Sequence, residues 1–278
     1  MRLRSLLFVP GDRPDRMTKA AGLDADALIL DLEDAVAASA KASARAAVAA
    51  FLAQERRLPL FVRINPLDSG LADDDLAAVL PARPDGIVLP KADGGASLSA
   101  LAARLSGDTR ILPIASETPA AIFTLGTYGG VTDRLCGLTW GAEDLPAAIG
   151  ATAAREADGS YTAPYQLARS LTLFGAHAAG VPAIETVYPD FRDLDALAQY
   201  AARGRRDGFA GMMAIHPSQI SVINAAFSPN EREIAHAREI IALFSRNPGA
   251  GALQFEGRMV DAPHLKAAQA LLASVSHP

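Results

Sequence analysis

The sequence predicts an α/β protein, a (β/α)8 TIM barrel with a C-terminal helical and hairpin extension. Eight apolar, strand-like runs alternate along the chain with alanine- and leucine-rich segments of helical spacing. Parallel strands need such crossover helices, and a regular series of strand–helix units is typical of a closed barrel. A doubly wound open sheet is the main alternative. It lacks the glycine-rich dinucleotide loop that should follow a strand, because "GGVTDR" at 129–134 precedes one.

The predicted strands are short and apolar on both faces, as expected where helices cover one side and a packed interior the other. They are residues 5–11, 27–34, 60–66, 86–92, 110–118, 135–145, 182–188 and 211–217. Helical spacing of apolar residues is clearest at 41–54, 71–80, 97–105, 165–179 and 193–206.

The chain continues beyond the eighth predicted strand. We expect a helix at 230–245, a linker at 247–252, a hairpin within 253–263 around Glu256 and Gly257, and a final helix from about Pro263. We therefore assign residues 1–246 to a catalytic barrel domain and 247–278 to a C-terminal arm. Because the arm is surplus to a barrel, we expect it to pack on a neighbouring subunit or to close over the barrel mouth.

Composition excludes several classes of partner. The net charge of the 278 residues is -5, whereas nucleic-acid binding requires a basic patch. Cys136 is the single cysteine, which excludes an internal disulfide and fits a reducing compartment. No apolar run is long enough to span a bilayer, and the N-terminal run is too short for a signal peptide. We expect a cytoplasmic protein with no membrane partner, in which Cys136 is a buried, inert thiol.

Polar residues follow the predicted strands, and many of them are acidic. In chain order they are Asp12; Asp31, Glu33 and Asp34; Arg63 and Asn65; Lys91; Glu117; Glu143 and Asp144; Glu185 and Tyr188; and His216. In a (β/α)8 barrel all strand ends meet at one face, where active sites are built. Carboxylates from the second, fifth and sixth strands should therefore converge, with Arg63 and Lys91 facing them across the barrel mouth.

Ordinary structural roles compete with this interpretation. Asp12 and Asp34 would also serve as helix caps, and Arg63 as an ion-pair partner for the carboxylates. Lys91 and Glu185 are better explained as members of salt bridges inside the barrel. For His216, a hydrogen-bonded turn residue is the more common role.

Glu117 and Asp144 are harder to explain structurally. Each follows an apolar run, where an unpaired carboxylate would be costly and a cation would relieve the cost. Mg²⁺ is favoured over Zn²⁺, since none of the five histidines has a second histidine or cysteine three to five residues away. Two carboxylates, waters and a bidentate substrate would complete its octahedron, and the cation would act as a Lewis acid on a substrate carbonyl. A purely structural acidic network remains the alternative.

The chain resembles, almost from end to end, the citrate lyase β-subunit-like (CitE-like) proteins of the HpcH/HpaI aldolase superfamily. The stretches that carry the resemblance, in order, are "RSLLFVPGDRPDRMTKA" (4–20), "ADALILDLEDAV" (25–36) with "KASAR" (41–45), "VRINP" (62–66), "VLPKA" (88–92), "SET" (116–118), "WGAEDL" (140–145), "GFAGMMAIHPSQI" (208–220) and "GRMVDAP" (257–263).

The resemblance implies a Mg²⁺-dependent carbon–carbon lyase that acts on malyl-, citramalyl- or citryl-type CoA thioesters and yields a keto acid and acetyl-CoA. It assigns the metal to Glu117 and Asp144, and the waters of the metal to Glu33 and Asp34. Arg63 would face the oxygen that becomes an enolate when the bond breaks.

Further roles follow from the same resemblance. Asp261 would reach the mouth of a neighbouring subunit as acid or base, and Arg16 and Lys19 are candidates for contacts with CoA phosphates. A homo-oligomer, a trimer or a multiple of one, is implied. Three positions depart from the family pattern, namely Ala121 for glycine, Met212 for lysine and Glu185 for aspartate.

Other functions remain open at this point. The same site would serve a thioesterase that hydrolyses malyl-CoA. It would also serve the β subunit of a multienzyme citrate lyase, in which a carrier protein replaces free CoA. A non-enzymatic assembly component is the last alternative, and the intact acidic set together with Arg63 and Asp261 argues against it.

Overall fold

The computed structural model describes residues 1–275, which form two compact units. The larger unit comprises Leu3–Asn224, and the smaller comprises Met1–Arg2 with the chain from Ala225 onward. The division lies earlier than the boundary at residue 246 expected from the sequence. The helix at 231–246 belongs to the smaller unit, because its buried residues Ala237 and Ile240 share a core with Ala268 of the last helix.

The larger unit is built on one eight-stranded parallel sheet. The strands are β1 (Ser5–Pro10), β2 (Ala27–Asp31), β3 (Leu60–Arg63), β4 (Gly86–Leu89), β5 (Arg110–Pro113), β6 (Leu138–Thr139), β7 (Ala183–Glu185) and β8 (Gly211–Ala214). Their order is β5-β4-β3-β2-β1-β8-β7-β6, and the bridges Ile111–Leu135 and Ile114–Thr139 join the two ends. The sheet therefore curls into a barrel, and the predicted TIM-barrel class is confirmed.

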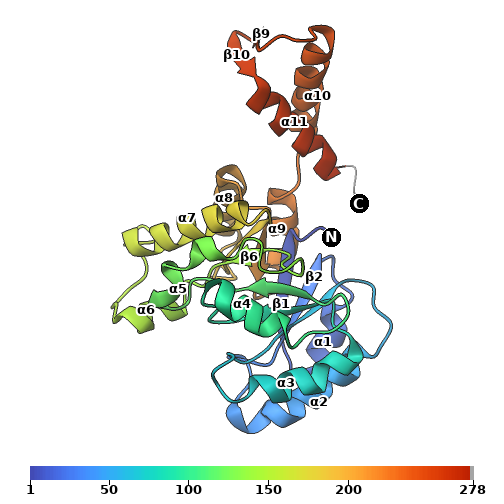
Figure 1. Ribbon diagram of the computed structural model, residues 1–278, viewed down its shortest axis with the longest axis vertical. Helices are drawn as coiled ribbons and strands as arrows, with labels where there is room; N and C mark the ends of the chain where they lie inside the picture. The colour runs from blue at the N-terminus through green and yellow to red at the C-terminus, as the bar shows by residue number, and fades with distance from the viewer. Residues whose placement is uncertain (276–278) are drawn as a thin grey trace. The chain divides into compact units, whose positions relative to one another are not determined.

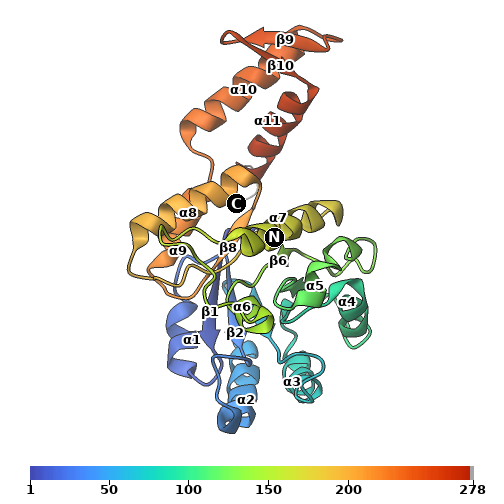
Figure 2. The ribbon, with the colours of Figure 1, turned by 90° about the vertical axis from the view of Figure 1, so that its left-hand side faces the viewer.

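Helices connect the strands and lie outside them (Figures 1 and 2). They are α1 (Pro14–Ala20), α2 (Lys41–Leu52), α3 (Ala72–Val79), α4 (Gly94–Ala102), α5 (Pro119–Ile122), α6 (Asp144–Ile149), α7 (Ala163–Ala178), α8 (Leu194–Asp207) and α9 (Gln219–Ala226). Short 3₁₀ helices occur at Ala38–Ala40, Leu80–Ala82 and Leu125–Thr127. None of the helices within residues 1–275 combines the length and the apolar character needed to cross a membrane.

The barrel interior is filled by alternate residues of the strands, because successive side chains of a strand point to opposite faces. Its buried members include Leu6 of β1, Ile29 of β2, Phe61 of β3, Val88 of β4 and Leu112 of β5. The residues between them, such as those at 28, 62 and 87, face the helices. This alternation decides which residues at the strand ends can point into the barrel mouth.

The smaller unit contains α10 (Glu231–Arg246), the antiparallel hairpin β9 (Ala252–Phe255) and β10 (Arg258–Asp261), and α11 (Ala262–Val275). A capping box begins α10: the Asn230 side chain accepts from the Glu233 N–H, and the Glu233 carboxylate accepts from the Asn230 N–H. The hairpin turns at Glu256 and Gly257, as predicted, and the final helix follows it directly. The expectation that this segment packs on a neighbouring subunit stays a prediction.

Candidate active site

A cavity of about 440 Å³ opens at the carboxyl ends of the barrel strands. Its walls carry acidic residues from the end of β2, from the loop that follows it and from the segments after β5 and β6, together with basic residues from β3 and α1. These are Asp31, Asp34, Glu117, Glu143, Asp144, Arg63 and Arg16. The convergence of strand-end carboxylates expected from the sequence is therefore present in the structure.

Arg63 lies at the centre of the acidic side of this cavity. Like Ile29 and Phe61, which fill the core, Asp31 and Arg63 occupy inward positions, each two residues further along its strand. The guanidinium donates from Nε and Nη2 to the two carboxylate oxygens of Asp31, at 2.7 and 2.6 Å. Burial opposes the charge of Arg63, but the hydrogen bonds and charge of Asp31 raise its pKa above the ordinary value. The bidentate pair fixes both the orientation and the charge of Arg63.

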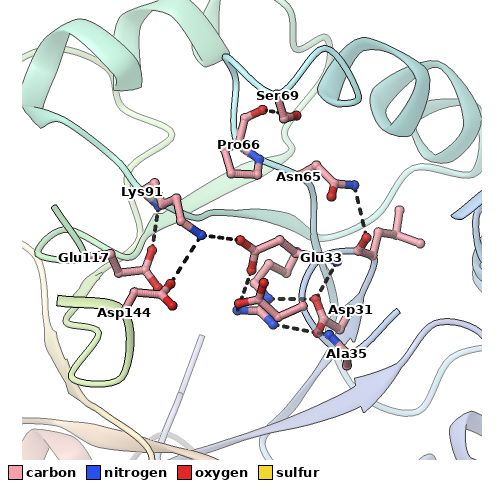
Figure 3. A network of polar contacts seen from close by, with 12 residues as sticks. Asp31, Glu33, Ala35, Asn65, Pro66, Ser69, Lys91, Glu117 and Asp144 are labelled. Atoms are coloured by element: carbon pink, nitrogen blue, oxygen red, sulfur yellow. Dashed lines mark hydrogen bonds and ion pairs between the residues drawn. The ribbon is translucent and has the colours of Figure 1, made fainter. Parts of the chain in front are cut away.

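Glu33 joins the two cationic side chains of the site. Its carboxylate lies 2.8 Å from Nη1 of Arg63 and accepts from Nζ of Lys91 at 2.7 Å. The residue is buried, and burial raises its pKa even though both cations favour the charged form. Figure 3 shows Glu33 between Asp31 on one side and Lys91 on the other. The side chain is therefore occupied by the protein's own cations.

The loop that carries Glu33 is held by Lys41, the first residue of "KASAR". Its ammonium donates to the carbonyl oxygens of Leu32 and Glu33, at 2.7 Å each, and to Oδ1 of Asn65 at 2.9 Å. These carbonyls lie beyond β2, where no neighbouring strand pairs with them. Lys41 therefore has a structural role: it holds the backbone of the loop that follows β2.

Lys91 organises the opposite side of the cavity. It has a left-handed backbone conformation with φ of 48°, which turns its N–H toward the Glu117 carboxylate. That N–H donates to Oε2 of Glu117 at 2.6 Å, and the side-chain Nζ lies 3.3 Å from Oδ2 of Asp144 (Figure 3). One residue therefore contacts both predicted metal ligands, through two different groups.

Glu117 is a buried carboxylate whose ionised form a nearby cation would stabilise. Its pKa is raised to about 8, mainly by burial and further by the charges of Asp144 and Glu33, while the N–H and the charge of Lys91 act in the opposite direction. The carboxylate packs against Gly141, where an added Cβ would overlap the Glu117 Cγ. Gly141 therefore makes room for the Glu117 side chain at the cavity wall.

The donor set fits Mg²⁺. Glu117 and Asp144 provide hard oxygen ligands on the same wall, and a cation between them would relieve the buried charge of Glu117. Within residues 1–275 no group of three or more His, Cys, Asp or Glu side chains is arranged to hold a metal.

The remaining predicted residues lie in different environments. Asp34 is exposed and 3.8 Å from Nη1 of Arg63, and Arg16 lines the cavity. Lys19, on the same helix as Arg16, is exposed and does not line the cavity. Asp261 lies at the end of β10 in the smaller unit, where its Oδ1 is 2.6 Å from Nδ1 of His264. The structure thus brings Asp34, Arg63, Glu117, Asp144 and Arg16 to one cavity, and Glu33 lies buried behind it, in contact with Arg63.

The positions that depart from the family pattern lie away from the cavity walls. Ala121 and Met212 are fully buried. Glu185 is buried too, and accepts hydrogen bonds from Trp140, Tyr200 and Arg169. Glu185 is therefore a structural residue, as expected.

Three residues that shape the site have no catalytic, metal-binding or CoA-binding role among the expectations from the sequence. Asp31 was one of several strand-end carboxylates, and only the alternation from Ile29 signals that it points inward. Lys91 was interpreted as a structural salt-bridge residue, and it does form salt bridges, but to Glu33 and Asp144 of the site. Gly141 lies in "WGAEDL", where no local pattern announces a close approach to a residue 24 positions earlier.

Comparison with known proteins shows which family the chain belongs to. Residues 4–217 match the model of the HpcH/HpaI aldolase/citrate lyase family. The chain is 34% identical to human mitochondrial citramalyl-CoA lyase, covering 96% of this chain and 83% of the relative. It is 34% identical to (3S)-malyl-CoA thioesterase of Cereibacter sphaeroides, covering 97% of this chain and 93% of the relative.

A solved structure extends the likeness to three dimensions. CitE of Mycobacterium tuberculosis, in complex with magnesium, acetoacetate and coenzyme A, superposes with a TM-score of 0.85 at 36% identity. The match covers 99% of this chain and 98% of that one. The chain therefore belongs to the HpcH/HpaI aldolase/citrate lyase family and is an enzyme of the carbon–carbon lyase class.

Proposed function

We propose that the protein is a Mg²⁺-dependent lyase that cleaves a CoA thioester of a hydroxy-dicarboxylic or hydroxy-tricarboxylic acid. Malyl-, citramalyl- and citryl-CoA are the candidate substrates, and the products are a keto acid and acetyl-CoA. The observation that carries this proposal is the single cavity that Glu117, Asp144 and the fixed guanidinium of Arg63 all line. The similarity to citramalyl-CoA lyase, and to CitE with magnesium and coenzyme A, supports it.

Glu117 and Asp144 would hold the Mg²⁺. When bound, the ion would supply Lewis-acid stabilisation of negative charge on the keto-acid part of the substrate. Glu33 and Asp34 were assigned to its waters. Asp34 is free to do this from its exposed position, whereas Glu33 is already bound to Arg63 and Lys91. We therefore propose that Glu33 acts mainly by orienting those two cations.

Arg63 would stabilise the enolate that forms on the acetyl-CoA part. Its Nε and one N–H of Nη2 are used by Asp31, and Nη1 is paired with Glu33. A guanidinium has five N–H groups, so donors remain for a substrate oxygen in the cavity that Arg63 lines. Because the carboxylates prevent it from turning, its charge is placed before the reaction begins, which is how electrostatic preorganisation lowers a barrier.

The reaction is then a retro-aldol type cleavage. The substrate hydroxyl gives its proton to a water molecule and becomes the keto oxygen, and the adjacent carbon–carbon bond breaks. The electron pair of that bond moves into the thioester enolate facing Arg63. A proton delivered to the enolate carbon completes acetyl-CoA, and we propose Asp261 of a neighbouring subunit as its donor. Arg16, at the cavity, and Lys19, on the same helix, would contact CoA phosphates.

Hydrolysis of the thioester is the second candidate function. The similarity to (3S)-malyl-CoA thioesterase favours it, and the same cavity would direct water onto the thioester carbonyl. A carrier-protein-dependent citrate lyase β subunit, which would need partner subunits, is a third possibility that the family name keeps open.

The test is to incubate the purified protein with Mg²⁺ and malyl-, citramalyl- or citryl-CoA, and to measure keto acid and free thiol separately. Keto acid without free thiol is expected, because the thioester survives in acetyl-CoA. Free thiol without keto acid would instead establish a thioesterase. No product from any of the three would contradict a free-CoA lyase and direct attention to acyl groups on a carrier protein.

A further inference from the structure

Lys91 is linked to more residues of the site than its assignment as a structural salt bridge explains. Its backbone N–H holds Glu117, and its ammonium lies 2.7 Å from Oε1 of Glu33 and 3.3 Å from Oδ2 of Asp144 (Figure 3). Alternating charges therefore run from Asp31 through Arg63, Glu33 and Lys91 to Asp144. Lys91 is the last cation of this series.

The two ion pairs of the ammonium differ. Glu33 is buried, so its contact with Lys91 lies in a protected environment, and the distance of 2.7 Å is that of a strong, charge-assisted hydrogen bond. Asp144 is about one-third exposed, and its distance of 3.3 Å from Nζ is longer. The contact with Asp144 is therefore the weaker of the two and the one that a competing cation can replace.

Asp144 is also a proposed ligand of Mg²⁺. The ammonium of Lys91 and the ion would therefore compete for the same carboxylate. We propose that Lys91 is the resident counter-cation of Asp144 in the metal-free enzyme, and that Mg²⁺ binding displaces its ammonium from Asp144 while the contact with Glu33 persists. Lys91 is then a positioning residue that weakens metal binding. This inference rests on the proposed metal site at Glu117 and Asp144.

Substitution can separate the two groups of Lys91. Any other residue with an N–H keeps the backbone hydrogen bond to Glu117, and a non-glycine residue keeps the same left-handed strain. Lys91→Met removes the charge at similar length, and Lys91→Gln removes it while leaving an amide that can donate to Glu33. Lys91→Arg keeps the charge. Lys266→Met, an exposed site in the smaller unit, serves as the control for loss of a lysine.

The experiment is isothermal titration of Mg²⁺ into each metal-free protein, without substrate. Both neutral variants should bind Mg²⁺ about fivefold more tightly than the unmodified protein, a change of about 1 kcal/mol, which is the upper end for a partly exposed ion pair. Lys91→Arg and Lys266→Met should bind it with nearly unchanged affinity. In a parallel melting experiment, Mg²⁺ should raise the melting temperature of the neutral variants by more than that of the unmodified protein.

Equal or weaker Mg²⁺ binding by the neutral variants would overturn the inference, because a residue that only supports the ligands should weaken binding when removed. If one neutral variant does not fold, the other decides the outcome. Asp144→Asn separates this failure from that of the metal site. If it binds Mg²⁺ as well as the unmodified protein does, the proposed site is wrong; if it loses Mg²⁺ while the Lys91 variants behave as the unmodified protein does, only the role of Lys91 is wrong.

Discussion

Glu117 depends on its neighbours for both its position and its charge. Glu117 follows β5. Its carboxylate accepts a hydrogen bond from the N–H of Lys91, and its side chain packs closely against the backbone of Gly141. Burial raises its pKa to about 8, so a nearby cation would favour its ionised form. Glu117, the proposed ligand, and Gly141 therefore form one structural unit.

Gly141→Ala should impair the site without removing any charged group. The added methyl would overlap the Glu117 Cγ and displace the carboxylate, and a displacement of about 1 Å can cost roughly 100-fold in rate. We expect weaker Mg²⁺ binding by calorimetry and keto-acid formation reduced by about that factor. Gly126→Ala, where nothing lies within 4 Å of the added Cβ, is the matched control. Full activity in Gly141→Ala would show that Glu117 can move without consequence.

Cys136 is predicted to be chemically inert in the folded protein. Cys136 is half-buried, not fully buried as the sequence predicts, and burial raises the pKa of its thiol to about 12, so the reactive thiolate is scarce at pH 8. Alkylation with iodoacetamide at pH 8, followed by mass spectrometry, should be slow in the folded protein and fast after unfolding in guanidinium chloride. Equal rates in the two states would mean that the thiol is accessible and ionised.

The strands of the barrel were the most predictable elements. Each of the eight apolar runs contains a strand, because the runs are short and flanked by turn residues. The sixth was overextended: the run at 135–145 contains only β6 at Leu138–Thr139, and Asp144 already begins α6. The apolar residues of a strand and those at the beginning of the next helix form one continuous run in the sequence. The alternation of apolar and polar residues therefore could not show where β6 ends.

The contacts between side chains at the strand ends were less predictable than the strands themselves. Sequence order places Asp31 and Arg63 on adjacent strands, and the register then pairs them directly. By contrast, the contacts of Lys91 depend on a left-handed backbone at a residue that is not glycine, which no periodicity predicts. The helix α10 was expected from the sequence, but its apolar face does not reveal which unit it packs against.

Gly211→Ala should destabilise the barrel itself. An added Cβ at the start of β8 would overlap the carbonyl oxygen of Leu3, which is backbone and cannot rotate away. Overpacking of this kind lowers the free energy of unfolding by about 1–3 kcal/mol. Urea denaturation followed by circular dichroism should show an earlier midpoint than in Gly126→Ala. An unchanged midpoint would mean that the strand adapts without cost.

At the scale of the whole molecule, the chain consists of a barrel unit with the candidate site and a smaller unit that carries Asp261. Asp261 is the last residue of the hairpin strand β10, and its carboxylate pairs with His264. Sequence reasoning identified this residue through its resemblance to a family motif. No pattern within one chain can show which subunit's cavity it serves.

Mixing two inactive variants tests whether sites are shared between subunits. Asp261→Ala and Arg63→Ala should each lose keto-acid formation, because one lacks the proton donor and the other the enolate-stabilising charge. If an arm completes a neighbour's site, random co-assembly in equal amounts should restore up to about one quarter of the unmodified activity. Native mass spectrometry would verify that mixed oligomers form. No recovery from verified mixtures would place both residues in the site of a single chain.

The central claim is that Glu117 and Asp144 share one divalent ion at the carboxyl ends of the barrel strands. Diffraction from crystals soaked in Mn²⁺, used as an anomalous substitute for Mg²⁺, tests it most directly. We expect a single strong anomalous peak in this cavity, about 2.0–2.3 Å from an oxygen of each carboxylate. A cavity without a peak, or a peak bound by other residues while Asp144 stays paired with Lys91, would contradict it.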